Sequence, residues 1–220
     1  MKHRPACFVF GAGPPPARPP KIAAQDLVIA ADGGYAYIQS LGIRLDALIG
    51  DFDSLSDFPN QGKGDFYVCR LPKEKDQTDL LAALEYGLER GFACFHIYGG
   101  IGGRLDHTLA NIQCLSFLVN RSARGYLYDS DTVVTAFKGE IRLAARRRGV
   151  VSLFALGESV EGVWLRGLKY ELTNARLSCD FPIGVSNAFT GLPVQIKVKH
   201  GILLAVYPAG TRELDSSPVN

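Results

Sequence analysis

The sequence predicts an α/β N-terminal domain with a mainly parallel, Rossmann-like sheet, followed by an all-β C-terminal sandwich. In the first half, short apolar runs alternate with segments of helical periodicity, which is typical of parallel strands joined by crossover helices. Beyond about residue 125 the chain changes to short β-rich runs separated by glycine. We therefore predict two domains, residues 1–125 and 126–220.

The strands expected in the first domain are apolar runs that end in glycine or aspartate, as strands that feed tight turns do. The helix expected before the last of these strands carries Leu80, Leu84 and Leu88 at helical spacing and has Gly91 as a C-terminal stop. The predicted strands are 6–11, 26–34, 47–54 and 92–100, and the predicted helices are 79–91 and 107–120.

In the second domain the clearest pattern is VQIKVKHGILLAVY, residues 194–207. Its residues Val194, Ile196 and Val198 alternate on one face of a strand, and His200 and Gly201 are expected to turn the chain into the next strand. The proline-rich segment 13–20 is expected to be an extended loop.

Composition excludes several classes of protein. Twenty-four Lys and Arg against 22 Asp and Glu give a net charge of +2, so no basic field indicates nucleic acid as a partner. Five cysteines without a C-x-x-C pair argue against a disulfide scaffold and a zinc ribbon. The apolar patch near the N-terminus is too short for a signal peptide or a membrane span, so we expect a cytoplasmic protein without a membrane partner.

Two aspartates at the end of the third strand indicate a metal site. In a strand, Asp51 and Asp53 would point the same way, and two ionised carboxylates repel each other unless a cation lies between them. Oxygen ligands select Mg²⁺ or Ca²⁺, and Mg²⁺ is usually completed by substrate phosphates. The alternative is that Asp51 caps a turn and Asp53 is solvated. Asp57 is expected to be a turn or capping residue.

A second acidic pair, Asp76 and Asp79, occurs where the helix 79–91 begins. Either Asp76 or Thr78 is suited to be the N-cap, and capping alone would explain these residues. Since they follow the first acidic pair in a chain whose strand ends are acidic, we also expect one of the two carboxylates to join the metal site.

The segment GGIGGRLDHTLAN, residues 99–111, is suited to binding an anion. Its glycines let the backbone approach a ligand, and the following helix offers free N–H groups. Arg104 provides a fork for phosphate oxygens, unless it is a surface arginine on a turn. His107 is expected to be a nucleotide contact rather than a catalyst. The segment lacks the lysine and the Ser or Thr of a Walker loop.

Six short motifs in order resemble the thiamine pyrophosphokinase family. They are ADGG, GDFDS, KDQTD and GGIGGRLDHTLAN in the first half, and GLKYEL and GVSN in the second, and they span residues 31–187. The resemblance implies a transferase, a kinase that moves pyrophosphate from ATP to the hydroxyl of thiamine and gives thiamine diphosphate and AMP. It also implies that the protein binds ATP and thiamine and requires Mg²⁺. It further implies a homodimer whose active sites lie at the subunit interface.

The resemblance also implies roles for individual residues. The first domain would bind ATP and metal, and the second would bind thiamine and dimerise. The residues implied are Asp51, Asp53 and Asp79 for the metal, with Asp53 or Asp79 as the catalytic base; Asp32, Arg104, Asp106, His107 and Asn111 for ATP; and Asp76, Thr78, Ser186, Asn187 and Phe189 for thiamine.

Three other functions fit the same residues. A pyrophosphokinase that acts on another alcohol, such as a hydroxymethylpterin, would have similar metal and ATP sites. A non-catalytic nucleotide-binding regulatory protein would not need two converging carboxylate pairs. A metal-dependent phosphohydrolase would release orthophosphate instead of AMP.

Overall fold

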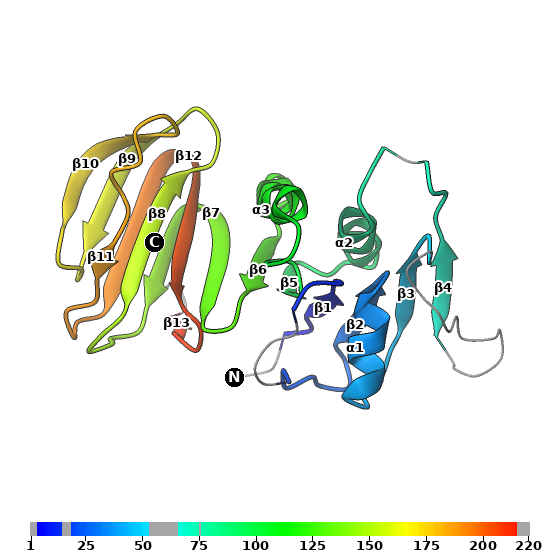
Figure 1. Ribbon diagram of the computed structural model, residues 1–220. Helices are drawn as coiled ribbons and strands as arrows, with labels where there is room; N and C mark the ends of the chain where they lie inside the picture. Colours follow the sequence, from blue (N-terminus) through cyan, green and yellow to red (C-terminus); the bar gives the residue numbers. More distant parts are fainter. Residues whose placement is uncertain (1–3, 15–18, 53–65, 75, 215–220) are drawn as a thin grey trace. The chain divides into compact units, whose positions relative to one another are not determined.

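The structure is a computed structural model that describes residues 4–14, 19–52, 66–74 and 76–214. The chain divides into two compact units (Figure 1). The first unit comprises Met1–Cys114 and Arg121–Ser130, and the second comprises Leu115–Asn120 and Asp131–Asn220. The main division therefore lies near residue 130, rather than at residue 125, because the strand that starts at Arg124 belongs to the first unit.

The first unit contains a sheet whose neighbouring strands are all parallel, in the order β6-β5-β1-β2-β3-β4. This confirms the α/β character expected of the first half. Its strands are β1 (Cys7–Phe10), β2 (Leu27–Ala31), β3 (Ala47–Gly50), β4 (Tyr67–Arg70), β5 (Cys94–Tyr98) and β6 (Arg124–Tyr128), and its helices are α1 (Gly34–Ser40), α2 (Asp79–Glu89) and α3 (Leu105–Asn120), whose last six residues are grouped with the second unit.

Helices cover both faces of this sheet. Phe8 and Phe10 of β1 belong to one apolar cluster with Tyr35 and Ile38 of α1. Cys7, which points to the opposite face because side chains alternate along a strand, lies against Gly87 of α2. Burial on both faces explains why these strands read as continuous apolar runs instead of alternating ones.

The order of the strands reverses at the centre of the sheet. From β1 the chain adds β2, β3 and β4 on one side, and then adds β5 and β6 on the other side. The reversal therefore lies at β1, between its neighbours β2 and β5. In open parallel sheets, ligands bind at this position, beyond the carboxyl ends of the strands.

The second unit is built from antiparallel strands. The longest, β12, pairs with β7 along one edge, and with β9 and then β8 along the other. The strands are β7 (Thr132–Leu143), β8 (Val150–Ala155), β9 (Ser159–Arg166), β10 (Leu172–Ser178), β11 (Asn187–Ala188), β12 (Val194–Pro208) and β13 (Glu213–Leu214). The expected all-β character agrees with this, whereas the closure of these strands into a two-layer sandwich stays a prediction.

Two expectations about strand ends were wrong. His200 and Gly201 do not turn the chain, since β12 continues through them with a register shift between Val198 and Leu203. Gly201 has φ +93°, which suits a bulge as well as a turn, and at this bulge β12 changes its partner from β9 to β8. The third strand ends at Gly50, before the aspartates that were expected to extend it.

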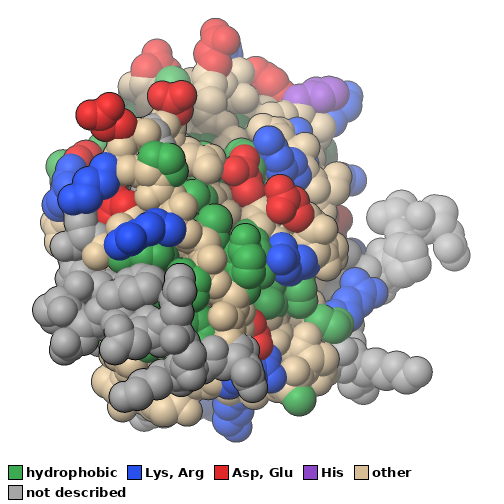
Figure 2. Space-filling view, turned by 90° about the vertical axis from the view of Figure 1, so that its right-hand side faces the viewer, with side chains coloured by type: hydrophobic (Ala, Val, Ile, Leu, Met, Phe, Trp, Pro, Cys, Tyr) green, Lys and Arg blue, Asp and Glu red, His purple; other side chains and the backbone are tan. Residues whose placement is uncertain are grey.

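The described surface carries charges of both signs, as the net charge of +2 leads one to expect (Figure 2). Figure 2 views the molecule from the side on which β4 lies in Figure 1, and basic and acidic side chains are interspersed on that face. None of the helices in the described residues is long and apolar enough to span a membrane. All five cysteines are free thiols, and Cys7 and Cys114 are buried.

Candidate functional site

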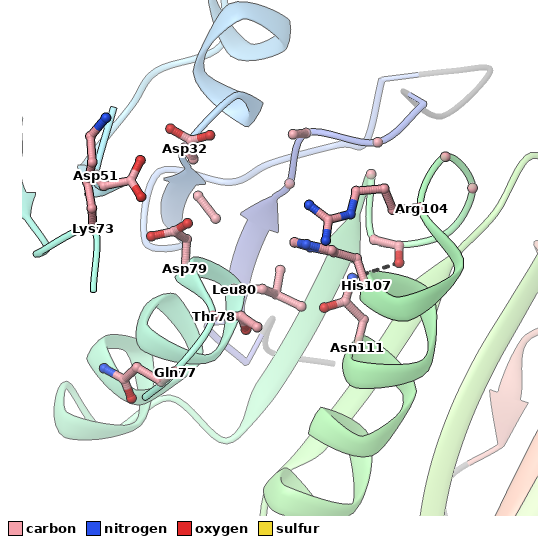
Figure 3. Close-up of a pocket in the computed structure, with 18 residues that line it drawn as sticks. Asp32, Asp51, Lys73, Gln77, Thr78, Asp79, Leu80, Arg104, His107 and Asn111 are labelled. Carbon is pink, nitrogen blue, oxygen red and sulfur yellow. Dashed lines mark hydrogen bonds between the residues drawn. The ribbon is translucent and has the colours of Figure 1, made fainter. Parts of the chain in front are cut away.

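The first unit contains a cavity of about 590 Å³ at the carboxyl ends of its strands. The loops that follow β1 and β5 both line it, so the cavity lies where the strand order predicts a ligand. Its lining residues are Gly11, Ala12, Gly13, Ala31, Asp32, Asp51, Lys73, Gln77, Thr78, Asp79, Leu80, Gly99, Gly100, Gly102, Gly103, Arg104, His107 and Asn111 (Figure 3).

Three carboxylates form an acidic side of the cavity. Asp32 follows β2, Asp51 follows β3, and Asp79 occupies the first turn of α2. Figure 3 shows the three side chains around the same part of the cavity, with Lys73 beside Asp51. The structure therefore brings together three of the predicted acidic residues, while Asp53 lies outside the residues that it describes.

The backbone is strained at two of these strand ends. Asp32 has φ +44° and Phe52 has φ +63°, in the left-handed region that side chains other than glycine rarely adopt. Phe52 is buried in the apolar cluster, and the guanidinium of Arg70 lies 5.8 Å from the centre of its ring. Burial of this ring compensates for the strain and fixes the position of Asp51, the residue before it.

Close backbone contacts hold the loops that follow β1 and β5 together. The N–H of Gly11 donates to the carbonyl of Tyr98 and that of Gly13 to the carbonyl of Gly99, both at 2.8 Å. A Cβ on Gly99 would lie only 2.5 Å from the oxygen of Gly11. Asn111, which is 7% exposed, donates from Nδ2 to the oxygen of Gly100 at 2.8 Å. Asn111 therefore positions the glycine loop, in addition to lining the cavity.

Arg104 and His107 form a basic side of the cavity, opposite the carboxylates in Figure 3. Arg104 donates from Nε and Nη2 to the two carboxylate oxygens of Asp106, at 3.2 and 2.6 Å. Asp106 itself does not line the cavity. Because a guanidinium has five N–H donors, this pair orients Arg104 and leaves donors for a phosphate.

The ion pair with Arg104 lowers the pKa of the Asp106 carboxyl group. The hydrogen bond from Arg104 lowers the pKa of Asp106 from 3.8 to about 2. A lowered pKa means that this contribution to stability is complete above about pH 4 and is lost as the pH falls through about 2. An NMR titration of the carboxyl group is expected to show a midpoint near 2, and Arg104→Gln should move it back towards 3.8. A midpoint unchanged by Arg104→Gln would contradict this account.

Two residues assigned by resemblance to thiamine, Asp76 and Thr78, lie at the start of α2. Thr78 is the N-cap of α2, and its Oγ1 accepts a hydrogen bond from the N–H of Leu81 at 3.2 Å. Thr78 also lines the cavity, but Asp76 does not, and it is exposed. The structure adds Gln77 and the pair Gly11 and Gly13, which the sequence did not assign; their only signal was a position directly after β1 or before α2.

The remaining predicted thiamine residues, Ser186, Asn187 and Phe189, lie in the second unit. Asn187 is 6% exposed, and its side chain donates to the carbonyl of Tyr170 at 2.7 Å and accepts from the N–H of Tyr170 at 2.9 Å. Ser186 is exposed with φ +60°. Phe189 is 5% exposed, with the guanidinium of Arg146 6.0 Å from its ring centre, so its ring offers little surface to a ligand.

Tyr170 is an aromatic residue that the sequence did not assign as a contact. Its side chain is 58% exposed, and the amide of Asn187 fixes its backbone on both sides. Val150, Ile183 and Val185 of the same unit are also exposed apolar side chains near β8 and β11. The second unit thus presents an apolar surface that includes the ring of Tyr170 and the ring of Phe181, which is 66% exposed. The ammonium of Lys169 lies 5.1 Å from the centre of the Tyr170 ring.

The carboxylates suit a hard cation. Asp51 and Asp79 supply the oxygen ligands that Mg²⁺ prefers, and both line the cavity. Within the described residues, however, no group of three or more His, Cys, Asp or Glu side chains is arranged to hold a metal ion. The chemistry of these two donors nevertheless fits Mg²⁺.

Comparison with known proteins identifies the family. Residues 20–127 match the thiamin pyrophosphokinase catalytic domain, and residues 140–203 match its vitamin B1 binding domain. The thiamine pyrophosphokinase of Bacillus subtilis (strain 168) is 29% identical over 184 residues, which cover 82% of this chain and 86% of that protein.

Solved structures agree with the sequence comparison. The crystal structure of the Bacillus subtilis thiamine pyrophosphokinase has a TM-score of 0.81 and 26% identity, and the match covers 94% of this chain and all of that one. The Geobacillus thermodenitrificans thiamin pyrophosphokinase has a TM-score of 0.79 and 26% identity, over 97% of this chain and all of that one. The two family models together span most of the chain, in the order of its two units, which confirms the resemblance of the six motifs. The chain belongs to the thiamine pyrophosphokinase family.

Proposed function

We propose that this chain transfers pyrophosphate from ATP to the hydroxyl of thiamine and releases AMP. The observation that carries the proposal is the cavity, in which a carboxylate side faces a glycine loop and an arginine at the carboxyl ends of the strands of a parallel sheet. Family membership supports thiamine as the acceptor, and the carboxylates support Mg²⁺ as the companion of ATP.

The residues of the first unit act mainly by position and charge. The hydroxyl oxygen of thiamine attacks the β-phosphorus of ATP, and the bond from that phosphorus to the oxygen bridging it to the α-phosphorus breaks, so that AMP leaves. Arg104 and the N–H groups at the start of α3 would stabilise the negative charge of the phosphates. Asp106 keeps the guanidinium oriented before the ligand arrives.

The acidic side would hold the metal and accept the proton. Asp51 and Asp79, together with Asp53, would bind Mg²⁺, which supplies charge neutralisation for the phosphates. Asp79 is a candidate for the carboxylate that takes the proton from the thiamine hydroxyl, because it lines the cavity from the rigid first turn of α2.

The second unit would bind the thiamine rings. Tyr170 supplies an exposed ring for stacking, next to Ser186 and Asn187, while Phe189 supports that segment from the core. An aromatic face attracts a cation, and thiamine carries a permanent positive charge on its thiazolium ring. The exposed apolar side chains of this unit support its association with a second copy of the chain as a homodimer. A solution mass of one chain, 23.9 kDa, at assay concentrations would contradict the dimer.

The decisive experiment is to incubate the protein with ATP, Mg²⁺ and thiamine and to separate the products. We expect thiamine diphosphate and AMP in equal amounts, and no AMP without thiamine. Orthophosphate without AMP would indicate a phosphohydrolase, and AMP formed only with another alcohol, such as a hydroxymethylpterin, would change the acceptor. ATP binding without any product would favour the regulatory protein.

A further inference from the structure

Three consecutive arginines, Arg146, Arg147 and Arg148, lie between β7 and β8 of the second unit. Arg147 and Arg148 are exposed, and within the described residues their side chains form no ion pair with a carboxylate. Other arginines of this unit are paired: Arg142 with Glu140, Arg166 with Glu171, and Arg176 with Glu161. Among the residues that the structure describes, the arginine turn therefore concentrates positive charge without an ion pair to a carboxylate.

This turn is fixed by hydrogen bonds and packing. Arg146 donates from Nε to the carbonyl of Arg148 at 3.5 Å, and its own carbonyl accepts from the N–H of Gly191 at 2.9 Å. Gly149 has φ +133°, and a Cβ there would lie 2.8 Å from Cγ of Pro208. Since the backbone is already ordered, an anion that binds here would not have to bear the cost of ordering the turn.

The arginine turn is continuous with the segment proposed to meet thiamine. The N–H of Phe189 donates to the carbonyl of Gly149 at 3.1 Å, and Val150 pairs with Ala188. Positive charge at this position disfavours a cationic ligand such as thiamine, because like charges repel. The same charge favours the product, in which a diphosphate group outweighs the charge of the thiazolium ring.

We propose that Arg147 and Arg148 form a subsite for the diphosphate group of a ligand bound by the second unit. The proposal rests on the proposed function for the identity of the organic part, but the chemistry recognised is the phosphoanhydride itself. Guanidinium forks bind phosphate oxygens in pairs, through charge-assisted hydrogen bonds that are stronger than neutral ones. Two sources carry this group in the reaction, thiamine diphosphate and ATP.

The test compares binding to the Arg147→Gln/Arg148→Gln variant with binding to the wild type. Isothermal titration with thiamine diphosphate should show a dissociation constant raised at least about tenfold, the order expected for loss of one charge-assisted hydrogen bond. Affinity for unphosphorylated thiamine should stay the same or increase. Inorganic pyrophosphate is the matching probe without an organic part, and its affinity should fall as well.

The control is Lys197→Gln/Lys199→Gln, which removes two exposed charges from β12 of the same unit. A loss confined to the arginine variant supports the subsite, and a similar loss in both variants overturns it in favour of a general electrostatic field. If ATP affinity falls and thiamine diphosphate affinity does not, the nucleotide is the source of the group. Unchanged affinity for all three phosphorylated probes overturns the proposal.

The proposed catalytic function and the proposed diphosphate subsite are tested by different experiments. Binding is measured without turnover, and AMP formation by the wild-type protein reports the catalytic function separately. Thermal unfolding of each variant shows whether it is folded, and the single variant Arg147→Gln serves if the double variant is not.

Discussion

Replacing Asp51 with asparagine is expected to reduce AMP formation by roughly a hundredfold to a thousandfold, the usual effect of removing one group that stabilises transition-state charge. The side chain keeps its size, but it loses the charge that would hold a cation among the carboxylates of the cavity. Because the metal would organise the reacting phosphates, kcat should fall more than the KM for thiamine rises. Steady-state kinetics with varied Mg²⁺ measures both changes.

The matched control is Asp129→Asn, an exposed aspartate that follows β6 and does not line the cavity. That variant should keep wild-type turnover. The fold of Asp51→Asn should also be intact, since its neighbours Gly50 and Phe52 are held by β3 and by the apolar cluster. Wild-type turnover by a folded Asp51→Asn protein would remove the metal assignment.

The sequence was sufficient to predict which strand ends come together around one cavity. Asp32, Asp51 and Arg104 follow apolar runs, and in a parallel sheet the ends of such runs converge at one edge. The structure places all three around one cavity. Asp79 was equally predictable, because a carboxylate in the first turn of a helix that begins at this edge must lie near it.

Details that depend on non-local pairing could not be predicted. Gly11 and Gly13 line the cavity because their loop bonds to residues 98 and 99, and a single sequence does not reveal that register. Gly201 was expected to form a turn, but its positive φ serves a bulge equally well, and only the pairing of β12 decides between the two.

The contacts of Asn187, a predicted site residue, also depend on non-local pairing and could not be predicted. Its motif indicated a ligand contact, yet its amide bonds to the backbone of Tyr170, seventeen residues earlier in the chain. A polar side chain between two apolar runs fits either role, and only the fold decides whether a backbone group is within reach. The consequence is that Tyr170, rather than the motif residue itself, presents the exposed ring.

Replacing Gly34 with alanine is expected to lower the free energy of unfolding by about 1–3 kcal/mol, the range for overpacking a tight contact. Gly34 begins α1, and a Cβ there would lie 1.9 Å from the backbone oxygen of Phe10 in β1. Alanine would otherwise favour the helix by about 1 kcal/mol. The contact with Phe10 decides the sign, because the oxygen belongs to a central strand and cannot move aside. Urea unfolding measures the change, with Ala36→Ser on the exposed side of α1 as the control.

Gly34→Ala also tests whether the second glycine of the ADGG motif is needed to position Asp32. The N–H of Tyr35 donates to the carbonyl of Asp32 at 3.1 Å, so a displaced α1 would pull on the strained residue at the acidic side of the cavity. Activity should then fall further than the unfolded fraction explains, when it is assayed well below the unfolding midpoint. If the folded fraction of Gly34→Ala keeps full activity, Gly34 serves packing alone, and the position of Asp32 does not depend on the start of α1.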